Sequence, residues 1–271
     1  SPAAAPAPPP ARAPAPAPTA APTTTVTVAK APLAKSDRPF LRARAGFTIG
    51  GYSYDQLPLS KTTVLFPKEL KLSSQSQGGA AQARFFVPGF EYIGAEAAIR
   101  ATVYSVDPKP LCAALENECA SAGLVYDWVL NEHVVAIGRY PFDVGDSTFH
   151  VGARVGWGNS DVQTYTVKEG EEILLDQLAL NSLSVGAELG ADIGPALFLT
   201  TTFNEQLAGG SAPFNTEFQF EVGYAFLPFL YASGAFDMSL REIGIENRDG
   251  DAVGQIADDF YSGTLSVGVQ F

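Results

Sequence analysis

The chain has 271 residues, of which 46% are hydrophobic, and its formal net charge is −12. The excess of acidic residues argues against binding to nucleic acid, because proteins that bind the phosphate backbone present a basic surface. The sequence has no run of about eighteen apolar residues, which excludes a transmembrane helix. A transmembrane β-barrel escapes this criterion, because only alternate residues of each strand face lipid.

Residues 1–36 form a segment of unusual composition. Nine of the first 22 residues are Pro, and most of the others are Ala. Such a sequence cannot bury a core and favours the extended, solvated polyproline II conformation, which spans about 3.1 Å per residue. We therefore expect a disordered Pro/Ala-rich tail at 1–36 and a single folded domain at 37–271.

From residue 40 onward, apolar residues alternate with small or polar ones in repeated segments. At the end of the chain, Leu265, Val267, Val269 and Phe271 alternate with small or polar residues. This period of two predicts β-strands with one apolar and one polar face. The pattern predicts ten strands, at 40–54, 80–87, 90–105, 124–140, 149–158, 177–193, 196–204, 217–226, 230–238 and 265–271.

Long and short connections alternate between these strands. The long ones are predicted at 55–79, 106–123, 159–176, 205–213 and 241–257, and short turns near 88, 144, 195 and 228. Alternation of this kind places the long loops on one rim of an up-and-down barrel and the short turns on the other.

The composition of the two faces distinguishes between kinds of barrel. A soluble barrel or sandwich fills its core with large aliphatic residues. Here the polar faces carry Gly, Ser, Thr and isolated charges, which suit a narrow lumen, and the apolar faces suit lipid. We expect an all-β fold, a transmembrane antiparallel up-and-down β-barrel of about ten strands. Eight or twelve strands are the alternatives, because the segments 80–87 and 196–204 are weak.

Three residues have specific expected positions. Glu132 interrupts the apolar face of segment 124–140, so we expect it above the hydrocarbon layer. Tyr92 alternates with the apolar residues of segment 90–105, so it falls on the polar face and is expected inside the lumen. Phe271 is expected at the rim of the barrel, beside Phe40.

The last ten residues resemble the C-terminal strand of bacterial outer-membrane β-barrels, which typically ends in Phe. The resemblance is carried by Leu265, Val267, Val269 and Phe271. It implies the outer membrane of a Gram-negative bacterium, contact with outer-membrane lipid, and recognition of the closing strand by the insertion machinery. Both termini would then be periplasmic. The chain opens at Ser1 without an initiator Met, which indicates a removed signal peptide.

The tail offers one candidate partner site. Residues 23–28 have high β propensity and are similar to the N-terminal box by which outer-membrane transporters contact an energy-transducing periplasmic protein. Addition of a strand to the partner's sheet would be the physical basis. The alternative is a Thr-rich connector, and the chain is far shorter than the large plugged barrels that carry such a box.

Charged residues on the polar faces are the main candidates for a functional site. In a barrel of this size, side chains occupy most of the interior. One interpretation is a network of paired charges that fills the lumen, and the alternative is a narrow path for ions or small solutes. The candidates are Arg42, Arg44, Arg84, Glu96, Arg100, Arg139, Arg154, Glu188, Asp192, Glu217, Glu221 and Asp237.

Cys112 and Cys119 lie in one predicted long loop. Export through an oxidising compartment favours a disulfide between them. The segment 247–251 loosely resembles a calcium loop but lacks the later bidentate Glu. The sequence therefore indicates no metal site and no cofactor.

Histidine residues give weak support to catalysis. Some small outer-membrane barrels are enzymes with histidine-containing sites near the outer rim. His133 has Asp127 on the same face six residues earlier, which is only half of an acid–base site. His150 lies beside a predicted short turn. We therefore assign no catalytic residues.

These patterns predict a structural or interaction component of a cell-envelope assembly, with the tail reaching into the periplasm towards a protein partner. The alternative is a narrow porin-like channel. An outer-membrane enzyme is the least favoured interpretation.

Overall fold

The structure is a computed structural model that describes residues 39–58, 69–106, 125–167, 173–208, 214–246 and 252–271. The predicted tail at 1–36, the possible disulfide of Cys112 and Cys119, and the segment 247–251 lie outside these residues.

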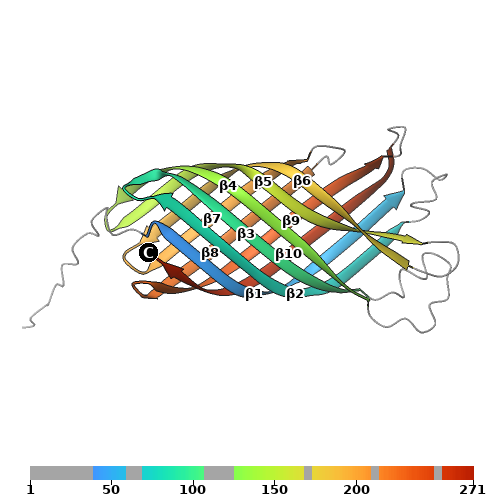
Figure 1. The fold of residues 1–271 in the computed structure, drawn as a ribbon, viewed down its shortest axis with the longest axis horizontal. Helices are drawn as coiled ribbons and strands as arrows, with labels where there is room; N and C mark the ends of the chain where they lie inside the picture. Colours follow the sequence, from blue (N-terminus) through green and yellow to red (C-terminus); the bar gives the residue numbers. More distant parts are fainter. Residues whose placement is uncertain (1–38, 59–68, 107–124, 168–172, 209–213, 247–251) are drawn as a thin grey trace, which may run out of the picture. The chain divides into compact units, whose positions relative to one another are not determined.

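A closed barrel of ten antiparallel strands makes up the described part (Figure 1). Each strand pairs with its neighbours in sequence, and β1 pairs with β10. The all-β, ten-stranded up-and-down barrel predicted from the sequence is therefore confirmed. The described ranges contain no helix that is long and apolar enough to cross a membrane. The strands are β1 (Leu41–Pro58), β2 (Leu70–Val87), β3 (Phe90–Val106), β4 (Val125–Val144), β5 (Ser147–Val167), β6 (Ile173–Ile193), β7 (Leu197–Ala208), β8 (Phe214–Leu227), β9 (Leu230–Glu246) and β10 (Ala252–Gln270).

The four short connections lie at one end of the barrel, called here the turn end, and the opposite end is the loop end. The turns between β2 and β3, β4 and β5, and β6 and β7 each contain a glycine with positive φ. Gly89, Gly145 and Gly194 have φ values of 74°, 61° and 58°, a conformation that costs other residues energy. The predicted positions of the short turns are confirmed.

Several strands extend further towards the loop end than the sequence predicts. β2 begins at Leu70 instead of residue 80, β5 ends at Val167, and β10 begins at Ala252. Most of the predicted loops 55–79, 159–176 and 241–257 is therefore strand. In these extensions the outer face becomes polar, so apolar and polar residues no longer alternate along the strand. Hydrogen bonding between neighbouring strands nevertheless continues.

The outer surface carries a band of exposed apolar side chains, called here the apolar belt. Ile49, Val134 and Leu265 are 62%, 63% and 78% exposed, whereas the inward-facing Glu188 is fully buried. A polar interior inside an apolar exterior is the inverse of a soluble protein and matches a barrel surrounded by lipid.

Exposed Glu132 is paired in register with Asn159 of β5 and Ile99 of β3, and exposed Trp128 lies further towards the loop end on the same face of β4. The expected position of Glu132 above the hydrocarbon layer therefore stays a prediction.

Tyr92 does not lie in the lumen, so this prediction is wrong. Its ring lies 5.3 Å from that of Phe90 and 6.3 Å from that of Tyr140, which is 62% exposed. The register between β2 and β3 shifts between Phe86 and Val87. Because of this bulge, side chains near the turn point to the opposite side of the sheet from the one that strict alternation along the strand predicts.

The seam between β1 and β10 closes the barrel. Phe40 N donates to Phe271 O at 2.6 Å, and Phe271 N donates to Leu41 O at 3.0 Å. The predicted position of Phe271 beside Phe40 is confirmed. Gly46 permits a close approach of the two strands, because a Cβ there would clash with the carbonyl oxygen of Leu265. Leu265, Val267 and Phe271 are exposed on the outer face.

Candidate functional site in the lumen

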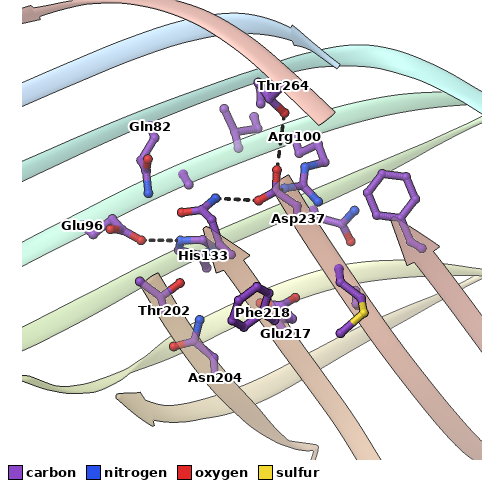
Figure 2. A pocket seen from close by; sticks show the side chains of 18 of the residues that line it. Gln82, Glu96, Arg100, His133, Thr202, Asn204, Glu217, Phe218, Asp237 and Thr264 are labelled. Atoms are coloured by element: carbon purple, nitrogen blue, oxygen red, sulfur yellow. Dashed lines mark hydrogen bonds and ion pairs between the residues drawn. The ribbon is translucent and has the colours of Figure 1, made fainter. Parts of the chain in front are cut away.

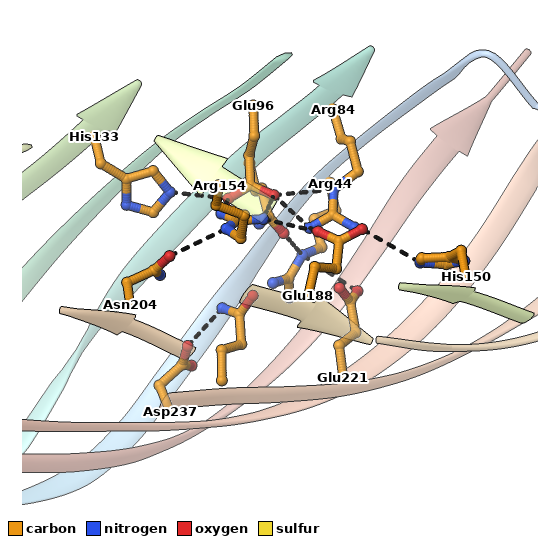
Figure 3. A network of polar contacts seen from close by, with 12 residues as sticks. Arg44, Arg84, Glu96, His133, His150, Arg154, Glu188, Asn204, Glu221 and Asp237 are labelled. Atoms are coloured by element: carbon orange, nitrogen blue, oxygen red, sulfur yellow. Dashed lines mark hydrogen bonds and ion pairs between the residues drawn. The ribbon is translucent and has the colours of Figure 1, made fainter. Parts of the chain in front are cut away.

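Four charged side chains from four strands meet inside the barrel and form what we call the charge layer. It consists of Arg84 from β2, Glu96 from β3, Arg154 from β5 and Glu188 from β6 (Figure 3). Each has the inward parity of its strand, because successive side chains of a strand point to opposite faces.

Each carboxylate of the charge layer contacts both guanidinium groups. Arg154 Nη2 lies 2.5 Å from Glu96 Oε1, and its Nη1 lies 2.8 Å from Glu188 Oε2. Arg84 Nε donates to Glu96 Oε2 at 2.9 Å, and its Nη2 lies 3.3 Å from Glu188 Oε2. The exposed fractions of Glu188, Glu96 and Arg154 are 0%, 2% and 3%, so these charges are compensated by one another and not by bulk water.

The two histidines flank the charge layer on opposite sides (Figure 3). His133 Nε2 lies 3.0 Å from Glu96 Oε1, and His150 Nε2 lies 3.3 Å from Glu188 Oε1. Neither histidine was assigned a role from the sequence. Their position on the polar faces was the available signal, but each carboxylate partner is a diagonal neighbour on the adjacent strand, and the long connections between these strands leave the register undetermined from the sequence.

Three further arginines lie inside the barrel near the charge layer, and two of them, Arg42 and Arg139, are on its turn-end side. Arg42 Nη2 pairs with Asp192 Oδ1 at 2.7 Å, and Arg44 Nε lies 3.3 Å from Glu221 Oε1. Arg139 contacts an aromatic ring, because its guanidinium carbon lies 3.4 Å from the centre of the Phe86 ring.

A cavity of about 80 Å³ lies on the loop-end side of the charge layer (Figure 2). Arg100 pairs there with Asp237 at 2.7 Å, and Gln219 Nε2 donates to the same carboxylate at 2.6 Å. Glu217 has no Arg or Lys partner within ion-pair distance among the described residues and instead accepts from Gln206 Nε2 at 2.6 Å. The network predicted from the sequence therefore includes amide groups that were not predicted.

Aromatic side chains lie inside the barrel nearer the loop end. The rings of Tyr52 and Tyr104 have centres 4.4 Å apart, and Tyr104 contacts Phe260 edge-on at 6.2 Å. All three side chains are buried, and Phe260 lines the cavity. This group was missed because Phe260 was not assigned to a strand.

At the loop end, outside the apolar belt, the surface becomes polar and charged. Lys71 Nζ lies 3.1 Å from Glu69 Oε1 and 3.2 Å from Asp55 Oδ2. The hydrogen bond to Glu69, followed by that to Asp55, raises the pKa of Lys71 above its ordinary value.

No group of three or more His, Cys, Asp or Glu residues within the described ranges could hold a metal ion. The histidines of the lumen contact carboxylates that also pair with arginine. What the arrangement can do chemically is to neutralise buried charge and to obstruct the lumen.

Solved structures similar to this chain are bacterial outer-membrane β-barrels. The outer-membrane protease OmpT of Escherichia coli has a TM-score of 0.43 and 9% identity, over 85% of this chain and 96% of that chain. Neisserial surface protein A has a TM-score of 0.30 and 13% identity, over 85% and 97%. The attachment invasion locus protein of Yersinia pestis has a TM-score of 0.30 and 10% identity, over 84% and 99%. No protein-family model and no curated protein matches the chain. At these scores and identities no functional conclusion follows.

Proposed function

We propose that the chain is a barrel of the Gram-negative outer membrane that serves as a structural or interaction component of the cell envelope and has a closed lumen. The apolar belt supports contact with outer-membrane lipid, because its exposed side chains include Ile49, Val134 and Leu265. In β1 the outward apolar residues span 41–49, and about nine to eleven residues of a tilted strand cross a bilayer.

The observation that carries the closed lumen is the charge layer. Its four side chains come from β2, β3, β5 and β6 and bond to one another across the interior. Separating Glu188 from Arg84 and Arg154 would leave unpaired charges in a poorly solvated space, at a cost of several kcal/mol. A closed lumen favours an anchoring role over transport.

A narrow channel for ions or small solutes is the second candidate. The cavity on the loop-end side of the charge layer favours it, because Arg100 and Asp237 would supply fixed charges along a path. The two candidates differ in whether the charge layer blocks conduction.

Electrical recording in planar bilayers separates these candidates. The full-length protein should produce no steady conductance above the bare membrane. Joint replacement Arg154→Ala and Glu188→Ala removes one positive and one negative side chain from the charge layer, so it should produce small, steady conductance steps.

The matched control is the joint replacement Arg100→Ala and Asp237→Ala. It removes another oppositely charged pair but leaves the charge layer intact, so the membrane should stay silent. Steady conductance by the unmodified protein would contradict the closed lumen and favour the channel.

The proposal extends to the tail at 1–36, whose composition suits an extended tether. With both termini periplasmic, as the resemblance of the last strand implies, the tail would reach a periplasmic or envelope protein. The insertion machinery would be a further, transient partner that recognises the closing strand ending at Phe271.

Deletion of residues 1–36 tests the tether. The shortened protein should still migrate as a heat-modifiable barrel, because the described strands begin at Leu41. It should lose the envelope proteins that co-purify with the full-length chain after crosslinking in cells. Unchanged co-purification would show that the tail is not the contact.

A further inference from the structure

The hairpin of β5 and β6 extends beyond both of its neighbours at the loop end (Figure 1). The two strands pair with each other along their full length. β5 pairs with β4 only as far as Ser160, and β6 pairs with β7 only from Ser182 onward. In the part of the chain that the structure describes, segments 161–167 and 173–181 therefore form a two-stranded ribbon with two unpaired edges.

The edge of β6 at 173–181, called here the open edge, is the longer of the two. At about 3.3 Å per residue it is roughly 30 Å long. Backbone N–H and C=O groups of alternate residues point away from β5 along it, so it presents a row of donors and acceptors that fits another strand. Open edges do not occur in hydrocarbon, where no water satisfies these groups, so the ribbon lies in water. A two-stranded ribbon on its own is marginally stable, so a third strand would stabilise it.

The chain itself is a poor source of this third strand. The connection 209–213 begins beside the open edge, but it is too short to run along the edge and return to β8, because an extended chain spans at most about 3.6 Å per residue. The connection 107–124 joins β3 to β4, which lie on the β5 side of the ribbon. Strands of membrane barrels are tilted by about 35–45°, so the open edges of two copies upright in one membrane would cross and not run side by side. These constraints favour a strand from another protein.

The sequence around the ribbon is acidic. Between residues 161 and 176, Lys168 is the single basic residue. The acidic residues of this segment are Asp161, Glu169, Glu171, Glu172 and Asp176. Charges of this kind attract a partner that carries Lys or Arg and repel an acidic one.

We propose that the open edge binds an extended, basic segment of a partner protein, which adds a third β-strand to the ribbon. Backbone hydrogen bonds hold the segment, and the acidic residues around the ribbon select its Lys or Arg residues. This surface is distinct from the tail at 1–36, to which the proposed function assigns its partner. The membrane setting rests on the proposed function, whereas the open edge follows from strand pairing alone.

Amide hydrogen exchange tests this proposal, with a synthetic peptide of alternating Lys and Val as the probe. The full-length protein in lipid vesicles is used, and mass spectrometry of its fragments follows the amides of 173–181. Without peptide, the amides on the open edge should exchange rapidly. At a peptide concentration of about ten times its Kd, their exchange should slow about tenfold, because only the unoccupied edge exchanges. The same peptide N-methylated at every residue lacks the N–H donors and should give no protection.

Charge reversal tests the selectivity for a basic partner. Glu171→Lys with Glu172→Lys should weaken binding of the Lys-Val peptide about tenfold and favour a Glu-Val peptide instead. Asp55→Lys with Glu69→Lys makes the same charge change beside Lys71 at the loop end and should leave binding unchanged.

Absence of protection by the Lys-Val peptide overturns the proposal. Equal protection by the N-methylated peptide also overturns it, because that peptide cannot add a strand. Slow exchange of every amide in 173–181 before peptide is added would mark an edge that is already covered, with the same consequence. Unchanged binding after reversal of Glu171 and Glu172 overturns the basic character of the partner. None of these results involves bilayer conductance or the tail, so the proposed function is tested separately.

Discussion

Glu188 shows how one residue depends on the whole barrel. Its side chain is fully buried and contacts Arg84 from β2, Arg154 from β5 and His150 from β5. An isolated buried carboxylate would be strongly unfavourable, so its charge is tolerated only because these partners converge on it. Removing its charge leaves two arginines with one carboxylate between them.

Glu188→Gln should therefore lower the free energy of unfolding by about 3–5 kcal/mol, the usual cost of breaking a buried ion pair. Urea titration of the refolded protein in lipid vesicles measures this change. Lys71→Gln breaks an ion pair on the exposed surface and should have no measurable effect. If both substitutions lowered the free energy of unfolding equally, the result would contradict the view that Glu188→Gln leaves an uncompensated charge buried in the lumen.

The sequence predicted the facing of most lumen residues but only part of their pairing. Arg84 and Glu96 are directly opposite in register on adjacent strands, so the short turn after Val87 makes their contact predictable. Arg100 and Asp237 come from β3 and β9 and meet across the lumen. Alternation along a strand shows whether a side chain points inward or outward. It gives neither the position of the side chain along the barrel axis nor its position around the circumference. These depend on the stagger of all the strands.

At the scale of strands, prediction worked inside the apolar belt and failed beyond it. β10 was assigned only from residue 265, although its pairing with β1 continues as far as Gly254. Asp258 and Asp259 interrupt the apolar alternation, so the predicted strand was not extended past them. Hydrogen bonding between neighbouring strands does not require an apolar face. Strand pairing without an apolar face therefore leaves no signal in a single sequence. The bulge between β2 and β3, which turns Tyr92 outward, was missed for a similar reason.

At the scale of the whole barrel, the interior follows an order along its axis. A small cavity lined by Arg42, Arg139, His150 and Asp192 lies nearest the turn end, the charge layer follows, and the larger cavity lies beyond it. Tyr52, Tyr104 and Phe260 pack inside the barrel near the loop end. The polar interior and the apolar exterior together require lipid outside and paired charges inside.

Spin labels along the outer face of β10 test this arrangement most directly. Cys112 and Cys119 are first replaced by Ser, and single cysteines are placed at Asp259, Leu265 and Val267 of the barrel in lipid vesicles. A further label at Ala98, which lines the larger cavity, reports the interior. Oxygen, which concentrates in lipid, and a water-soluble nickel chelate are the two relaxing agents.

The labels at 265 and 267 should relax strongly with oxygen and weakly with the chelate, and the label at 259 should reverse this order. The label at 98 should respond weakly to oxygen, because it faces the interior. Strong relaxation by the chelate at 265 and 267, equal to that at 259, would contradict a barrel that is surrounded by lipid.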